Sequence, residues 1–324
     1  MKPTHHLLLI CVLLITGCLG QAAPPATLDS KPATQELGEG EQWFDDWFTI
    51  TELDETTFAI GEPLYWQKNY NYLIVGEERA LLLDSGPGVR DITPVVDHLT
   101  SLPVTVTQSH AHFDHIGNHH LFDVAALADV PSLVAEVDDD VFHPCRQQYL
   151  KLRPPEITVS EWLQPGEPID LGGRQIIALH TPGHTEGSMT LLDRQRRFLF
   201  TGDFLYPGTL LASLPGSSLI QYLDSTNALI LQTRGGETIY GAHATSNHPS
   251  PSLEFEVLTD LAAALAGLVA GDLEFRRNRY TVNDNVSLTV WRGWTAESDG
   301  AMTPACDAPP QDHRSRAQTR SPAE

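Results

Sequence analysis

Short apolar or alternating runs, separated by turn-forming residues, fill the first half of the chain. They are WFTITEL (47–53), TFAIG (57–61), YNYLIVG (70–76) and RALLLDSG (79–86). Runs of this length that are bounded by turn residues are typical of β-strands. We therefore predict a β-meander in this part of the chain.

Helical patterns near residues 89–100 and 117–128 flank a further run, VTVTQ (104–108), which we predict to be a buried strand. The second half repeats the strand pattern with RQIIALH (174–180), GSMTLLD (187–193), RRFLFTGD (196–203) and ETIYGAH (237–243). Apolar residues three and four apart then predict a helix over 253–269, and Gly271 is expected to end it. Two strand-then-helix halves favour an α/β fold of four αββα layers, with two sheets packed face to face.

The two ends of the chain differ from this folded part. An apolar run, LLLICVLLIT (7–16), follows Lys2 and is too short to span a bilayer, so we interpret residues 1–17 as a signal peptide. Ile15-Thr16-Gly17-Cys18 resembles the bacterial lipobox, in which cleavage leaves a diacylated cysteine; an ordinary secretory signal is the alternative. The expected location is therefore outside the cytoplasm, as a lipoprotein held by Cys18 to a membrane and exposed to the periplasm or the cell surface.

Composition divides the rest of the chain. Residues 18–40 are rich in Ala, Pro, Gly and polar residues and are expected to be a flexible tether. Residues 296–324 have few groups to bury and are expected to be a disordered tail, which leaves 41–295 as the folded domain. Cys145 and Cys306 remain after export, and a disulfide between them is left open.

The charge of the chain limits its partners. The formal net charge is −22, whereas nucleic acids and anionic membranes are bound by clustered Lys and Arg. We therefore expect no nucleic-acid partner, and membrane attachment only through lipid. A small-molecule substrate remains.

Histidines and acids gather where the strand 104–108 ends. The stretch TVTQSHAHFDHIGNHH (105–120) places His110, His112 and Asp114 two residues apart, with His115 next. Alternate residues of an extended chain point to one side. Imidazole and carboxylate are the usual ligands of zinc and similar cations.

Strands of the second half deliver three further candidate ligands. His184 follows IIALHTPG, Asp203 ends FLFTGD, and His243 ends TIYGAH. A lone histidine after a strand is usually an ordinary loop or core residue, but this series of strand exits gives seven candidates, enough for two metal ions.

These segments resemble the metallo-β-lactamase superfamily. The resemblance rests on HAHFDH (110–115), TPGHT (181–185), TGD (201–203), GAH (241–243) and DSG (84–86), and extends over roughly residues 45–285. It implies two Zn²⁺ ions, or other divalent transition metals, with Asp203 bridging both and Asp84 orienting a ligand imidazole. The implied ligands of one ion are His110, His112 and His184, and those of the other are Asp114, His115 and His243.

Sequence details point to a branch of the superfamily. Residues 202–225 resemble the branch that contains acyl-thioester hydrolases, and the spacing from Asp203 to Tyr206 is similar to that in acyl-homoserine-lactone lactonases. Glyoxalase-II-like thioesterases share the core. Two departures, Gly117-Asn118 after the first motif and Ala244 after His243, bear on the substrate more than on the metals.

The predicted chemistry is hydrolysis of an ester, lactone or thioester by a hydroxide that bridges two metal ions. Asp114 is expected to orient this nucleophile as well as to bind metal. Tyr206 would donate a hydrogen bond to the oxyanion or leaving group; a structural tyrosine at the sheet edge is the alternative. Phosphodiester or β-lactam hydrolysis and a non-catalytic metal-binding module of the same fold are kept as alternatives.

Other histidines are assigned no chemistry. His119, His120, His143 and His248 are expected at the rim or surface. His180 lies four residues before His184 but precedes a turn instead of continuing a helix, so we predict a structural role for it.

Overall fold

The computed structural model describes residues 37–144 and 155–300. The predicted lipid anchor at Cys18 and both partners of the possible disulfide, Cys145 and Cys306, lie outside these residues. Across the described ranges, no helix has the length and apolar character needed to cross a bilayer.

The predicted meander forms the first part of a ten-stranded sheet. Strands β1 to β5 pair in sequence order, each antiparallel to the next, and β5, β6, β7 and β10 then run parallel. The order across the sheet is β1 (Gln42–Trp43), β2 (Thr49–Asp54), β3 (Thr57–Glu62), β4 (Asn69–Val75), β5 (Ala80–Leu83), β6 (Val104–Thr107), β7 (Val124–Ala128), β10 (Ile157–Leu163), β9 (Val141–Phe142) and β8 (Val137–Asp138).

A second sheet contains the strands predicted for the second half. Its order is β11 (Pro168–Asp170), β12 (Gln175–His180), β13 (Met189–Asp193), β14 (Phe198–Gly202), β16 (Thr238–Gly241) and β17 (Ser252–Leu253). Neighbours are antiparallel except β14 and β16, which are parallel.

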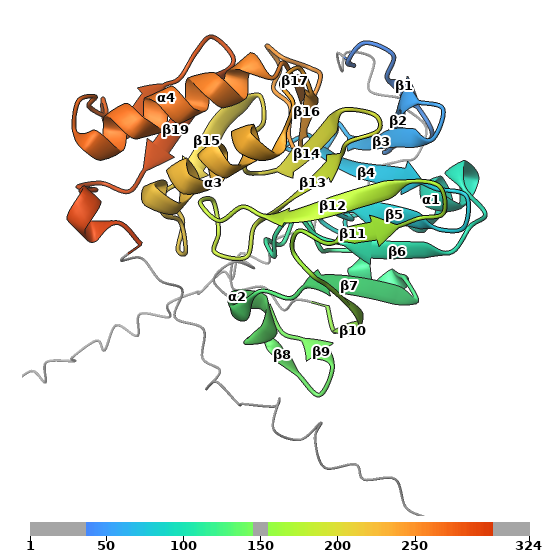
Figure 1. Ribbon diagram of the computed structural model, residues 1–324. Helices are drawn as coiled ribbons and strands as arrows, with labels where there is room; N and C mark the ends of the chain where they lie inside the picture. The colour runs from blue at the N-terminus through green and yellow to red at the C-terminus, as the bar shows by residue number, and fades with distance from the viewer. Residues whose placement is uncertain (1–36, 145–154, 301–324) are drawn as a thin grey trace, which may run out of the picture. The chain divides into compact units, whose positions relative to one another are not determined.

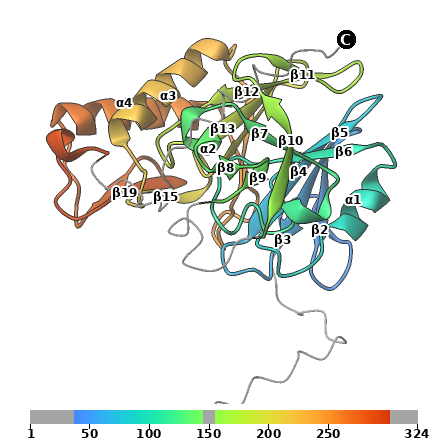
Figure 2. The ribbon, with the colours of Figure 1, turned by 90° about the horizontal axis from the view of Figure 1, so that it is seen from below.

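Side chains that alternate along the second sheet separate two hydrophobic clusters. Phe200 of β14 packs between the sheets, where its ring centroid lies 4.9 Å from that of Tyr72 on β4. The hydroxyl of Tyr72 donates to the Gly241 carbonyl at 2.5 Å, which ties the two sheets together. Leu192 and Leu199 belong to the second cluster, on the outer face. Figure 2 shows the two sheets as separate layers.

Helices cover the outer faces of both sheets. α3 (Leu219–Gln232) and α4 (Glu256–Ala270) lie on one side of the pair of sheets, and α1 (Thr93–Leu99) lies on the opposite side (Figure 1). α2 (Pro131–Val134) is a single turn. α4 ends as predicted, because Gly271 takes a left-handed conformation with φ 79°. The predicted four-layer αββα arrangement is confirmed.

One predicted helix is wrong. Residues 117–128 form a 3₁₀ turn, η1 (His119–Leu121), and then strand β7. β7 is paired on both sides, with β6 and β10, and a strand buried in this way carries a continuous apolar run that has no alternation. In the sequence alone, this apolar run is therefore indistinguishable from part of a buried helix.

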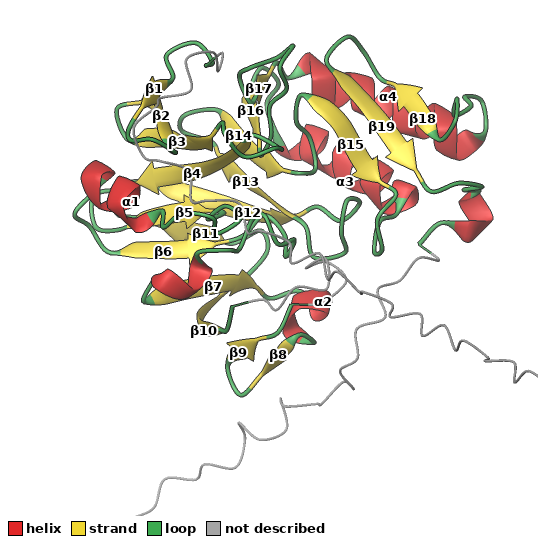
Figure 3. Ribbon diagram, turned by 180° about the vertical axis from the view of Figure 1, so that it is seen from behind, coloured by secondary structure: helices red, strands yellow, loops and turns green. Residues whose placement is uncertain are grey.

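A third, three-stranded sheet and helix α3 were not anticipated. The sheet contains β15 (Gly208–Ala212), β19 (Val286–Val290) and β18 (Arg279–Thr281), and Figure 3 shows it with α3 and α4 behind it. The chain also continues in defined structure past residue 295, the predicted end of the domain. A second 3₁₀ turn, η2 (Ala296–Ser298), is followed by Asp299, whose carboxylate contacts α3. The partner of Asp299 lies 80 residues away along the chain. Local composition contains no sign of such a contact, so it could not place this boundary.

Candidate metal centre

The candidate ligands lie where parallel strands end. β5 and β6 are parallel in the first sheet, and β14 and β16 are parallel in the second, so their carboxyl ends meet at common edges. Asp203 follows β14 directly. Gly202 has φ 54°, and a Cβ on it would collide with the side chain of Ser109, so glycine permits this strand exit to pass beside the first motif.

Four of the predicted ligands form one buried group: His110, His112, His184 and Asp203. Nδ1 of His112 lies 2.8 Å from Nε2 of His110 and 3.1 Å from Nε2 of His184. A single imidazole nitrogen carries at most one proton, so it cannot donate to both neighbours. Three nitrogens converging in this way fit the ligand set of a metal ion.

The other three predicted ligands, Asp114, His115 and His243, form a second buried group, and Asp203 lies between the two groups. Its Oδ1 faces the second group, at 2.9 Å from Nε2 of His243 and 3.5 Å from Nε2 of His115. Its Oδ2 faces the first, at 3.5 Å from Nε2 of His184 and 3.9 Å from Nε2 of His110. The two carboxylate oxygens are thus shared between the groups.

The outer nitrogens of several rings are fixed by hydrogen bonds. Nδ1 of His115 lies 2.8 Å from Oδ2 of Asp84, and Nδ1 of His184 lies 2.8 Å from the Leu211 carbonyl. Nδ1 of His110 lies 3.1 Å from the hydroxyl of Ser109, which is itself 2.8 Å from Asp84. Protons held on these Nδ1 atoms direct the Nε2 atoms at the centre of the site, where the neutral form of each ring could bind metal.

Burial keeps the first group of imidazoles neutral. Burial and neighbouring imidazoles hold the pKa of His110 and that of His112 well below their usual range. Burial also lowers the pKa of His184. Neutral imidazoles are the form that binds metal, so these rings are ready to do so near neutral pH.

His115 titrates in the opposite direction. Burial lowers its pKa, but the charges of Asp114, Asp84 and Asp203 raise it to about 10. For Asp203, burial raises the pKa, but the neighbouring His243 and His115 hold this pKa well below its usual value. A metal ion that binds Nε2 of His115 must therefore displace a proton.

Buried atoms without partners support the fit of a cation. Within the described residues, Oδ2 of Asp114 and Nε2 of His115 are buried and make no hydrogen bond. Most buried polar atoms in proteins are paired, so such orphans require an explanation. The donor set of imidazole nitrogens and carboxylate oxygens suits zinc or another divalent transition metal.

Tyr206 lies beside this centre, but its hydroxyl is already engaged. The ring contacts His243 edge to face at 5.0 Å between centroids, and the hydroxyl donates to the Thr209 carbonyl at 2.5 Å. To donate to a substrate, the hydroxyl would have to leave Thr209.

Of the histidines without an assigned role, His119 was placed wrongly. It is 1% exposed, and its Nδ1 lies 2.7 Å from the hydroxyl of Ser85. Its neighbour in sequence, Asn118, is tied to the same serine, so the 3₁₀ turn is drawn into the core. His180 is exposed, and one ring nitrogen lies 2.8 Å from the Glu186 carbonyl, outside the two ligand groups.

Sequence reasoning missed residues that hold the candidate ligands in place. Asn69 donates from its side chain to the Asp114 carbonyl at 2.7 Å, and its backbone forms an isolated bridge with His243. It lies 45 residues before Asp114, so nothing local indicated this contact. Ser109 was detectable in principle, because a serine directly before the first ligand is placed to bond its neighbours.

Similar proteins are known from animals and bacteria. The chain is 30% identical over 209 residues to the acyl-coenzyme A thioesterase MBLAC2 of Gallus gallus. The aligned region covers 57% of this chain and 76% of that protein. It is 26% identical over 153 residues to the hydroxyacylglutathione hydrolase GloC of Haemophilus influenzae. Here the aligned region covers 44% of this chain and 69% of that protein.

Solved structures share the fold. A metallo-beta-lactamase from Pontibacter korlensis superposes with a TM-score of 0.52 at 14% identity, covering 68% of this chain and 99% of that one. The sequence pattern of the metallo-beta-lactamase superfamily matches residues 65–247, which is more than half of the chain and includes all seven candidate ligands. The chain therefore belongs to the metallo-β-lactamase superfamily.

Proposed function

We propose that this superfamily hydrolase uses two divalent metal ions, zinc by its donor set, to cleave an ester, a lactone or a thioester. The observation that carries the proposal is the position of Asp203. Its two carboxylate oxygens face two separate groups of buried ligands, which is the arrangement that a bridging ligand requires.

In this proposal the first ion is held by His110, His112 and His184, and the second by Asp114, His115 and His243. A metal pair of this kind supplies a hydroxide nucleophile near neutral pH and polarises the carbonyl oxygen of the substrate. Asp203 joins both sets.

The surrounding residues prepare the site for that chemistry. Asp84 holds His115 with Nε2 directed inward. Oδ2 of Asp114 is buried, makes no hydrogen bond within the described residues and lies 3.8 Å from Nε2 of His243, so it is free to accept a hydrogen bond from the attacking water. Tyr206 is the proposed donor to the oxyanion or leaving group, provided that it turns away from Thr209.

The names of the relatives favour a thioester among the three carbonyl substrates. An acyl-coenzyme A thioesterase and a hydroxyacylglutathione hydrolase are both similar to this chain. The acidic composition agrees with a small-molecule substrate and no nucleic-acid partner.

A substrate panel tests the proposal. Purified protein loaded with zinc should hydrolyse at least one thioester, lactone or simple ester faster than phosphodiesters or β-lactams. Preference for a phosphodiester or a β-lactam would replace the substrate class. Tight binding of two metals with no hydrolysis across the panel would instead indicate a metal-binding module.

We also propose that the protein is an exported lipoprotein anchored through Cys18, because Gly17-Cys18 follows an apolar run of signal-peptide length. Mass spectrometry of the membrane fraction should show Cys18 as the first residue, carrying acyl chains. A soluble chain that is cut elsewhere and has an unmodified or missing Cys18 would contradict this.

A further inference from the structure

The carboxylate of Asp299 is surrounded by donors from a distant part of the chain. It accepts hydrogen bonds from the hydroxyl of Ser218 at 2.5 Å, from the backbone N–H of Leu219 at 2.8 Å and from that of Ile220 at 3.1 Å. Nε1 of Trp294 donates to it at 2.8 Å. The first N–H groups of a helix have no partner within the helix, and a carboxylate satisfies them with charge-assisted bonds. Asp299 thus fixes the start of α3.

The start of α3 in turn holds the loop that carries His184. The hydroxyl of Ser217 donates to the His184 carbonyl at 2.8 Å, and the backbone N–H of Ser218 donates to the Gly183 carbonyl at 2.9 Å. Gly183 has φ 152°, and a Cβ there would collide with the ring of Tyr222, so loop and helix are in direct contact. The backbone of His184 is therefore positioned by α3.

Backbone position decides where the His184 ring points. Its Nδ1 is bound to the Leu211 carbonyl, and its Nε2 faces His112 and Asp203. A shift of the loop would break one of these contacts. His184 is thus held from two directions: its ring by the Leu211 carbonyl of β15, and its backbone by Ser217 just before α3.

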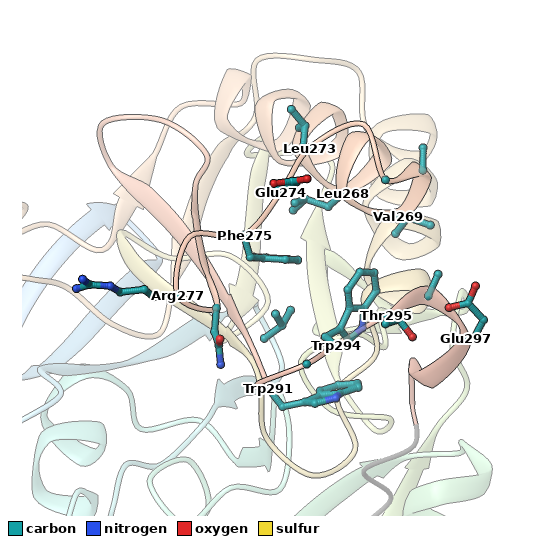
Figure 4. Close-up of a pocket in the computed structure, with 16 residues that line it drawn as sticks. Leu268, Val269, Leu273, Glu274, Phe275, Arg277, Trp291, Trp294, Thr295 and Glu297 are labelled. Atoms are coloured by element: carbon teal, nitrogen blue, oxygen red, sulfur yellow. The ribbon is translucent and has the colours of Figure 1, made fainter.

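Asp299 itself is held by its own short segment. Thr295 and Ser298 form a capping box around η2. The ring of Trp294 packs edge to face against Phe275, with centroids 5.9 Å apart, on the wall of a pocket of about 630 Å³ between α4 and residues 291–297 (Figure 4). This segment lies beyond residue 247, where the superfamily match ends, so the support comes from a part of the chain outside that match.

We propose that Asp299 is a positioning residue for the metal centre, acting through the start of α3 and Ser217 on His184. The proposal rests on the proposed role of His184 as a metal ligand. A helix cap with only a structural role would change the stability of the fold and leave the metal affinity of the folded protein unchanged.

The test compares zinc affinity, measured by chelator competition, in the full chain and in the variants D299A, S217A and D299A/S217A. Removing a group that orients a metal ligand typically costs 10- to 100-fold in affinity, and we expect a loss in this range for D299A. Because the two residues act in series, the double variant should bind zinc about as weakly as the weaker single variant. D272N removes an exposed negative charge that has no described side-chain contact and should bind zinc like the wild type.

The outcomes separate this inference from the proposed function. Zinc affinity in D299A equal to that of the wild type would overturn the role of Asp299 and leave the proposed function standing. The same conclusion would follow if the losses in D299A and S217A multiplied in the double variant. Failure of the wild-type chain to bind zinc would overturn the proposed function and the inference together. If D299A does not fold, D299N carries the same test, since it keeps one accepting oxygen and removes the charge.

Discussion

Replacing Asp84 tests how the structure controls the protonation of a proposed ligand. Oδ1 of Asp84 accepts from the backbone N–H of Ser109 at 2.6 Å, while Oδ2 lies 2.8 Å from both the Ser109 hydroxyl and Nδ1 of His115. In D84N the amide oxygen must remain toward the Ser109 N–H, because an NH₂ group there would face another donor. The NH₂ group then faces His115 and forces Nδ1 to accept. The one proton of the neutral ring is then held on Nε2, the atom that is proposed to bind metal.

The two substitutions D84N and D84A should therefore separate metal affinity from stability. Loss of an orienting partner costs about 10- to 100-fold in affinity, or about 1.4 to 2.7 kcal/mol. For D84N we expect a loss of zinc affinity at or beyond the upper end of this range, because the amide imposes the wrong tautomer on His115. For D84A we expect a loss near the lower end, because the His115 ring can still adopt either tautomer. Stability should rank in the other order. Asp84 has φ 63°, a conformation that Asn tolerates and that costs Ala roughly 1 to 2 kcal/mol.

Chelator competition gives the zinc affinity of each variant, and thermal unfolding in chelator gives the stability of the metal-free protein. D272N, an exposed change without a described side-chain contact, serves as the control for loss of one negative charge. Zinc binding by D84N that equals the wild type, or that is tighter than binding by D84A, would refute the tautomer argument.

Three further changes address the centre and its surroundings. D203A should lower the zinc content from two ions towards one and abolish turnover, because both oxygens of the bridge are lost; two tightly held ions with full activity would sink the assignment. Y206F should lower kcat on the best carbonyl substrate about 10²- to 10³-fold, with the metal content unchanged. A kcat equal to that of the wild type would mean that the Tyr206 hydroxyl has only the structural role of bonding Thr209. Burial lowers the pKa of His119 to about 3, so below pH 6.5 the unfolded chain binds a proton that the folded chain does not. The stability of the metal-free protein should accordingly fall from pH 6.5 towards 3, and H119Q should show a shallower fall; equal slopes would contradict the assignment.

Local patterns were enough to predict the strands β2 to β6, β12 to β14 and β16, and the places where these strands end. The candidate ligands at positions 110, 184, 203 and 243 each follow an apolar run, so period and spacing alone were enough to mark them as candidates. The segment 117–128 failed because a strand paired on both sides has no polar face to reveal its period. Helix α3 was readable, since Leu219, Tyr222, Thr226 and Leu229 recur at helical spacing after Ser218.

Contacts between distant segments could not be read from the sequence. Asn69 meets Asp114 across 45 residues, and Asp299 meets Leu219 across 80. Such pairs form only when the sheets and helices have packed. The sequence around one residue of the pair does not indicate which distant residue it will contact. Their effect is on the precision of the site, so the sequence marks residues that could be ligands but does not show which residues would hold them in place.

Each group of ligands draws on both sheets. The first combines His110 and His112 with His184 and Asp203, and the second combines Asp114 and His115 with His243. Neither half of the chain alone offers either complete group, so under the proposed function tight metal binding requires that the two sheets have docked. Once bound, the ions would fasten the sheets together. At a free metal concentration 1,000-fold above the dissociation constant, each ion would add about 4 kcal/mol to the work of separating them. Refolding in chelator should therefore yield a docked protein whose two sheets separate more easily than those of the metal-loaded protein. This expectation follows from the division of the proposed ligands between the two sheets.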